Sequence, residues 1–110
     1  MSVPAPIRNV LSDLEKGLKG LYGDRFRGLL LYGSYARGDE REGSDVDLLL
    51  LLEGPVNPAR EIMHLQTVKW PLALEANLTL SVMPFSVEEF ERAGSIFLRT
   101  VRREAIPVAA

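Results

Sequence analysis

The chain has 110 residues, 46% hydrophobic and 25% charged, which is the size and composition of a single soluble globular domain, residues 1–110. Its net charge of −2 argues against nucleic acid as a partner, and the lack of cysteine excludes disulfide scaffolds and thiolate metal sites. The longest apolar run, Leu48–Leu52, is too short to span a bilayer and no signal-peptide pattern opens the chain, so we expect a cytoplasmic protein without a membrane segment.

The first predicted element is a helix. Apolar residues recur at intervals of three and four between Ile7 and Leu21, and they form one stripe along a helical surface. We expect Gly23 to end this helix, because glycine readily adopts the left-handed conformation that follows a helix. The next segment, Phe26–Tyr32, contains three consecutive leucines without alternation, which indicates a strand buried on both faces.

A connection and a second strand follow. Residues 33–44 form the connection, which we expect to include a short helical turn from Ser34. Val46–Glu53 contains five consecutive leucines and is predicted to be the central strand of the sheet, also buried on both faces.

The third helix should start at Asn57-Pro58, where a capping asparagine precedes a proline at the first helical position. We expect it to run to about Trp70. Pro71 should kink or end it, because proline lacks the N–H that a helix interior needs, with a further turn to about Glu75 as the alternative.

The last third of the chain contains two strands and two helices. In Asn77–Met83 apolar and polar residues alternate, which predicts a strand with one buried face. Ser86 and Glu89 form a capping box. The remaining predicted elements are helices at Val87–Arg92 and Ile96–Glu104 and an edge strand at Ile106–Val108. This order indicates an α/β fold in which a small mixed sheet of about four strands is flanked by helices.

One motif points to chemistry. Gly33 and Ser34 follow the first strand, ten residues intervene, and then Asp45 and Asp47 flank a valine where the second strand begins. Residues two apart on a strand share a face, so the two carboxylates should project together. Adjacent carboxylates repel each other unless a cation lies between them, and oxygen ligands of this kind suit Mg²⁺. The backbone N–H groups of a Gly-Ser turn are suited to bind phosphate.

Purely structural roles explain these residues less well. Gly33 and Ser34 alone would serve as a turn and a helix cap. Asp47, however, opens a run of five leucines, where a carboxylate without a partner is costly.

The Gly33-Ser34 pair, the spacer and the two aspartates resemble the pattern of the nucleotidyltransferase superfamily, which includes DNA polymerase beta and kanamycin nucleotidyltransferase. The strings Gly-Ser-x-Ala-Arg-Gly and Ser-Asp-x-Asp-Leu are similar to those of its minimal, stand-alone members. The resemblance covers nearly the whole chain and implies the polymerase-beta-like nucleotidyltransferase fold.

The resemblance also implies a reaction, the transfer of a nucleoside monophosphate from an NTP, most plausibly ATP, to an acceptor hydroxyl. Gly33 and Ser34 would then bind phosphate oxygens, while Asp45 and Asp47 would be the catalytic pair that ligates Mg²⁺. Two interpretations of Arg37 stay open: it reaches the phosphates or the acceptor, or it is a surface charge or forms a salt bridge with Asp39.

The sequence departs from the family pattern at a third carboxylate, which a neighbouring strand usually carries. The strand Asn77–Met83 has no acidic residue, and Thr79, Leu80 or Ser81 occupies the position. Glu75, just before that strand, is one candidate replacement. Three alternatives result: a weakened enzyme, an enzyme completed by a partner's residue, or a protein that only binds nucleotide.

Two functional hypotheses follow. In the first, the chain is a Mg²⁺-dependent nucleotidyltransferase. Stand-alone relatives are commonly encoded beside a small helical HEPN-type protein, so the resemblance implies that AMP is transferred to a hydroxyl of such a partner, with this chain as the antitoxin of a toxin–antitoxin pair. In the second, the chain is a catalytically weak or inactive module that binds nucleotide or caps the helical partner.

Overall fold

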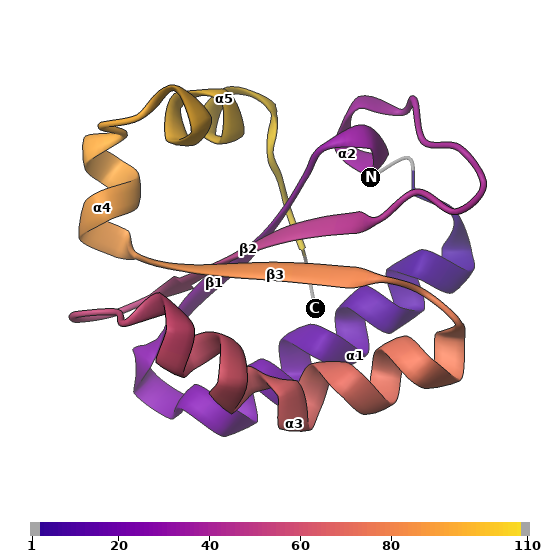
Figure 1. Cartoon of the computed structure of the whole chain (residues 1–110), viewed down its shortest axis with the longest axis horizontal. Coiled ribbons are helices and arrows are strands. Elements are labelled where there is room, and N and C mark those ends of the chain that lie inside the picture. Colours follow the sequence, from indigo (N-terminus) through magenta and orange to yellow (C-terminus); the bar gives the residue numbers. More distant parts are fainter. Residues whose placement is uncertain (1–2, 109–110) are drawn as a thin grey trace.

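The computed structural model of the chain describes residues 3–108. Figure 1 shows a single sheet with helices on both sides. The elements in chain order are α1 Ala5–Tyr22, the short 3₁₀ helix η1 Gly23–Arg25, β1 Phe26–Tyr32, α2 Ser34–Arg37, β2 Val46–Leu52, α3 Pro58–Ala76, β3 Leu80–Ser86, α4 Val87–Arg92, α5 Ile96–Glu104 and β4 Ile106–Pro107. In the described range, no helix is long and apolar enough to cross a membrane.

The strands form one mixed sheet in the order β3-β2-β1-β4. β1 runs antiparallel to both β2 and β4, whereas β2 runs parallel to β3. β2 is therefore an inner strand, as its run of leucines predicts. The register pairs Asp47 of β2 with Tyr32 on one side and with Ser81 on the other.

Different helices cover the two faces of the sheet. α1 and α3 lie side by side on one face, and α4 and α5 lie on the other (Figure 1). Leu48 and Leu50 of β2 pack into the core under α1 and α3, while Leu49 packs against α5. Because successive residues of a strand point to opposite faces, Asp45 and Asp47 belong to the face that α5 covers.

Local sequence signals act as predicted in several elements. The stripe of α1 is fully buried at Leu11 and Leu14, and the helix ends at Gly23, whose φ is +56°. The capping box of α4 is formed: the Ser86 hydroxyl accepts a hydrogen bond from the Glu89 N–H, and the Glu89 carboxylate accepts one from the Ser86 N–H. The short helical turn is present as α2.

The predicted end of α3 near Trp70 is wrong, because the helix continues through Pro71 to Ala76. Pro71 removes one hydrogen bond from the helix. The turns on both sides of it nevertheless pack against α1 and β3, with Leu65 buried before the proline and Ala73 buried after it. Burial of these turns outweighs the local cost, and the observed end lies close to the longer of the two predicted alternatives.

The predicted bounds of β3, Asn77–Met83, are also wrong, because the strand is Leu80–Ser86. Asn77 adopts the left-handed conformation, with φ at +53°, and its N–H bonds to carbonyls of the last turn of α3, so this residue closes the helix. The alternation itself is confirmed, since Leu80 and Val82 are buried in the core under α1 and α3. β2 and β4 each end one residue earlier than predicted.

Candidate functional site

A pocket of about 380 Å³ lies at the end of the sheet where β1 finishes and β2 begins. The sequence-predicted residues Gly33, Ser34, Arg37, Asp45 and Asp47 all line it. The fold thus brings the Gly-Ser turn and the two aspartates, which ten intervening residues separate in sequence, to one cavity.

The two aspartates place negative charge in this pocket, which the single guanidinium of Arg37 offsets only in part. Asp45 is exposed and Asp47 is half-buried. Burial of Asp47, together with the charge of Asp45, raises the pKa of the Asp47 carboxyl, and the positive charge of Arg37 acts in the opposite sense. A carboxylate that is destabilised in this way favours a proton or a metal cation as its partner.

Gly33 is tightly enclosed beside Asp47. Its φ is +76°, a conformation that side chains rarely adopt, and a Cβ atom built on it would fall on the Asp47 carboxylate. Glycine therefore permits the turn to pass directly against the aspartate. The Gly33 carbonyl then accepts hydrogen bonds from the N–H groups of Ala36 and Arg37, which starts α2.

The salt bridge between Arg37 and Asp39, one of the alternatives that the sequence leaves open, is present, while contact with phosphates or an acceptor stays a prediction. The Arg37 guanidinium lines the pocket, and its Nε donates to Asp39 Oδ2 at 3.2 Å. Its Nη1 donates to Glu104 Oε1 at 3.3 Å, and the Gly33 N–H donates to the same oxygen at 3.2 Å. Glu104, the last residue of α5, is therefore part of the site.

Sequence reasoning missed Glu104, because no local pattern marks it. The predicted edge strand after α5 would have located Glu104 only if the strand that pairs with this edge strand, and the register of the pairing, had been known. Other lining residues that the sequence did not single out are Tyr32, Ser44, Phe97, Thr100 and Val101. The aromatic rings of Tyr32 and Phe97 meet edge to face, with centroids 5.5 Å apart.

No acidic residue takes the place of the third carboxylate on β3. The register puts Ser81 beside Asp47, and paired residues of neighbouring strands share a face, so of the three residues considered Ser81 is the nearest to Asp47. Leu80 points into the opposite, buried face. Glu75 is exposed on α3 and does not line the pocket.

The donor set of this pocket fits a hard divalent cation such as Mg²⁺, with part of its coordination supplied from outside the chain. Three carboxylates, those of Asp45, Asp47 and Glu104, line the pocket together with one guanidinium, that of Arg37. Within residues 3–108, no three acidic, histidine or cysteine side chains lie close enough to hold one ion. Phosphate oxygens and water are the usual complement of carboxylates around Mg²⁺.

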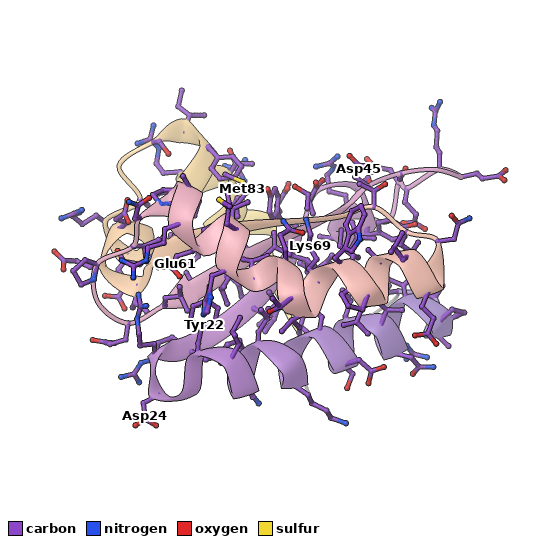
Figure 2. The ribbon with its side chains drawn as sticks, turned by 60° about the horizontal axis from the view of Figure 1, so that its bottom comes forward. Tyr22, Asp24, Asp45, Glu61, Lys69 and Met83 are labelled. Carbon is purple, nitrogen blue, oxygen red and sulfur yellow. The ribbon has the colours of Figure 1, made fainter. Side chains whose placement is uncertain are left out.

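A larger cavity, about 850 Å³, lies between α1 and α3 at the opposite end of β2. Figure 2 shows Tyr22 and Glu61 close together at that end of the molecule and Asp45 toward the other end. The Tyr22 hydroxyl donates to Glu61 Oε1 at 3.1 Å, and Arg25 Nη1 lies 3.8 Å from Glu61 Oε2, so these groups satisfy one another. None of the sequence-predicted residues lines this cavity, and we assign the candidate site to the smaller pocket.

A four-stranded mixed sheet with a Gly-Ser turn facing two aspartates at one end defines a nucleotidyltransferase type of domain. The family model described as "Nucleotidyltransferase domain" matches residues 11–101 of this chain. The chain therefore belongs to the nucleotidyltransferase domain family, and the resemblance drawn from the motif is confirmed.

Three curated relatives come from Methanocaldococcus jannaschii, and each bears the name "Putative protein adenylyltransferase". The three matches are 38% identical over 47 residues, 42% identical over 41 residues and 42% identical over 45 residues. The matched segments make up 43%, 37% and 41% of this chain, in the same order. The matched segments span 48%, 41% and 31% of the relatives' own lengths, less than half in each case.

Solved structures share the fold at low sequence identity. A toxin–antitoxin with AMP-PNP has a TM-score of 0.59 at 15% identity, and a mutant of the toxin–antitoxin MntA-HpeT has one of 0.63 at 14%. Each likeness covers 94% of this chain and 73% of the other. A "putative nucleotidyltransferase" from Sulfolobus solfataricus has a TM-score of 0.52 at 15% identity, and the likeness covers 97% of this chain and 89% of the other. The predicted fold class, a polymerase-beta-like α/β domain, is confirmed.

Proposed function

We propose that this chain, as one nucleotidyltransferase domain spanning residues 1–110, transfers AMP from ATP to a hydroxyl group of a partner protein. The observation that carries the proposal is the convergence of the Gly-Ser turn and two aspartates on one pocket in a chain of this family. Relatives named as protein adenylyltransferases favour ATP as donor and protein as acceptor. AMP-PNP, present in a protein of the same fold, is an analogue of ATP.

In the proposed reaction the acceptor oxygen attacks the α-phosphorus of ATP, and the proton of the acceptor hydroxyl passes to solvent water. A new O–P bond forms, the bond from the α-phosphorus to the bridging oxygen breaks, and pyrophosphate leaves. Bound Mg²⁺ would supply charge neutralisation for the phosphates and the departing pyrophosphate. Asp45 and Asp47 would hold the ion, because both line the pocket and because burial of Asp47 and its repulsion by Asp45 favour a cation beside them.

The Gly33–Ser34 turn and Arg37 bind the phosphate chain. Because Gly33 has no Cβ, the turn passes directly against Asp47, and phosphate donors and metal ligands share one small pocket. Arg37 supplies a guanidinium, whose planar N–H groups match phosphate oxygens, beside carboxylates that would otherwise repel a nucleotide.

The partner we propose is a small helical protein of the HEPN type, with this chain as the antitoxin. An apolar stripe on α3 supports a protein partner: Met63, Trp70 and Leu74 are 77%, 58% and 62% exposed. Their spacing of seven and four residues puts them on one face of the helix. Apolar patches of this kind mark interaction surfaces.

A second candidate function is a nucleotide-binding or partner-capping module with little or no catalysis. Ser81 beside Asp47 favours it, because the residue there cannot hold a metal ion or accept a proton as a carboxylate would.

Intact-mass spectrometry tests the choice. The chain is incubated with ATP, Mg²⁺ and the small helical protein encoded beside it, and the partner should gain the mass of one or more AMP units. Asp47→Asn should slow this gain at least about a hundredfold, because the metal site loses a ligand worth several kcal/mol in the transition state. Asp24→Asn, at an exposed aspartate remote from the pocket, is the matched control and should leave the rate unchanged (Figure 2).

Modification of the partner by Asp47→Asn at the wild-type rate would refute the catalytic assignment. A complex that forms and binds ATP but leaves the partner mass unchanged would favour the second candidate.

A further inference from the structure

We infer that Glu104 is the positioning residue for the phosphate-binding part of the pocket, because its carboxylate orients both the Gly33 peptide and the Arg37 guanidinium. The inference rests on the proposed function and deepens it. It assigns to the C-terminal helix α5 a role that the Gly-Ser and aspartate motif does not include.

One oxygen atom carries both contacts. Glu104 Oε1 accepts from the Gly33 N–H at 3.2 Å and from Arg37 Nη1 at 3.3 Å. These donors flank α2, one just before its first residue and one on its last, so a single side chain holds the short helix at both ends. The Glu104 side chain is only 20% exposed, and water screens its contacts less than those of an exposed pair.

Backbone pairing explains why Glu104 stands at this point. β4 pairs antiparallel with β1, with Ile106 opposite Leu31. Glu104 ends α5 two residues before Ile106, and Gly33 follows Leu31 by two residues, so this pairing brings the end of α5 beside the Gly-Ser turn. On the other side, α5 is anchored to the sheet by buried residues that include Val101. The position of the carboxylate is therefore determined by the sheet and the core, not by a free surface loop.

Gly33 consequently lies between two carboxylates. Asp47 of β2 lies against its Cα, and Glu104 receives its N–H from the other side. Glu104 does not complete a metal site in this arrangement, since no three acidic groups among residues 3–108 meet at one point. The Oε1 atom of Glu104 is occupied by the Gly33 N–H and the Arg37 guanidinium, so we assign Glu104 the role of positioning these two groups.

The contacts prepare Arg37 for an anion. A half-exposed arginine alone loses considerable side-chain freedom when it binds a ligand. Here Asp39 holds Nε and Glu104 holds Nη1. A guanidinium has five N–H donors, so the remaining ones are left for phosphate oxygens. Because these contacts act on binding of the phosphate chain and not on bond breaking, we expect Glu104 to affect KM more than kcat.

The test measures Kd for Mg·ATP, together with kcat and KM, in Glu104→Ala and Glu104→Gln. Glu104→Ala should raise Kd and KM about tenfold with kcat within about threefold, because both hydrogen bonds that orient the phosphate-binding groups are lost while those groups themselves remain. In Glu104→Gln the amide oxygen still accepts from the Gly33 N–H, so Kd should rise no more than about threefold. Glu53→Gln is the matched control: this exposed carboxylate pairs with Arg27 at 3.1 Å at the far end of β2, and its loss should change neither constant.

Two further measurements keep the test independent of overall stability. Hydrogen exchange of the Gly33 amide in the nucleotide-free protein should accelerate in Glu104→Ala and stay protected in Glu104→Gln. In an Arg37→Ala background, Glu104→Gln should have no additional effect on Kd, because the contact with Arg37 that this substitution weakens is already absent, while the bond from the Gly33 N–H is kept.

Wild-type affinity in Glu104→Ala would overturn the inference. Tighter binding would overturn it as well, since the carboxylate would then compete with phosphate. A loss confined to kcat would do the same. If the wild type binds no Mg·ATP, the proposed function fails and this inference falls with it, whereas normal wild-type binding with an unaffected Glu104→Ala removes the inference alone.

Discussion

At the residue scale, the candidate site depends on the close approach of Gly33 to Asp47. A φ of +76° and the lack of room for a Cβ atom are independent reasons for glycine at this position. Asp47, in turn, has its pKa raised mainly by burial, so the pocket holds a carboxylate at some cost to stability in the absence of a cation. Natural proteins tolerate such local costs chiefly where a ligand offsets them.

Replacement of Gly33 by alanine tests this crowding. Gly33→Ala should lower the free energy of unfolding by about 1 to 3 kcal/mol, because the new Cβ meets the Asp47 carboxylate and the backbone is held in a left-handed conformation. Urea denaturation measures the change. Gly20→Ala is the control: nothing lies within 4 Å of a Cβ at Gly20 in α1, and this variant should gain up to about 1 kcal/mol. Equal stability of the two variants would show that a Cβ atom at position 33 is not crowded by Asp47.

At the element scale, the packing of α1 on α3 explains why α3 continues past Pro71. The two helices cover one face of the sheet, and a buried polar contact ties their ends together (Figure 2). Burial, aided by the neighbouring Glu61, raises the pKa of the Tyr22 phenol, which stays protonated and donates to Glu61. Glu61 is 6% exposed, so its carboxylate depends on this donor and on Arg25.

Removal of that donor should weaken the helix pair. Tyr22→Phe should lower the free energy of unfolding by about 1 to 3 kcal/mol, because the buried Glu61 carboxylate loses a hydrogen-bond partner. Glu88→Gln, which breaks an exposed pair with Arg92 at 3.2 Å, should change stability by less than about 0.5 kcal/mol. Denaturant unfolding of both variants decides the matter, and a neutral Tyr22→Phe would show that the contact contributes little.

At the scale of the whole molecule, the pocket joins two segments that lie far apart in sequence, residues 32–47 and residues 97–104. β1, α2 and β2 supply the motif, and α5 closes the pocket from the C-terminal side. Binding in such a pocket should stabilise the entire fold, because a ligand that binds only the native state shifts the unfolding equilibrium.

Mg·ATP should therefore raise the melting temperature. At a hundredfold excess over Kd the stabilisation is about 2.7 kcal/mol, or roughly 10 °C for a domain of this size. Differential scanning fluorimetry measures the shift, with Mg²⁺ alone and ATP alone as controls that should give less. The double variant Asp45→Asn with Asp47→Asn should lose most of it. An unchanged melting temperature with Mg·ATP would remove nucleotide binding from both candidate functions.

Much of the fold could be predicted because local signals agreed with the tertiary structure. The stripe of α1, the leucine run of β2 and the Ser86–Glu89 capping box each act within a few residues of sequence. The errors lie where packing outweighs a local signal. α3 passes Pro71 because both flanking turns are buried, and β3 starts late because Asn77 closes that helix.

The family of this protein, the strand that begins at its two aspartates and the turn that faces them could all be recognised in the sequence. Those features are local: a glycine-serine turn and a two-residue alternation on a strand need no distant partner to be recognised. The positions of Ser81 beside Asp47 and of Glu104 beside Gly33 and Arg37 became visible only in the folded chain. The first follows from the register of β2 and β3, and the second from the packing of α5 and the pairing of β4 with β1. Both depend on which elements meet, which is not written in any single segment.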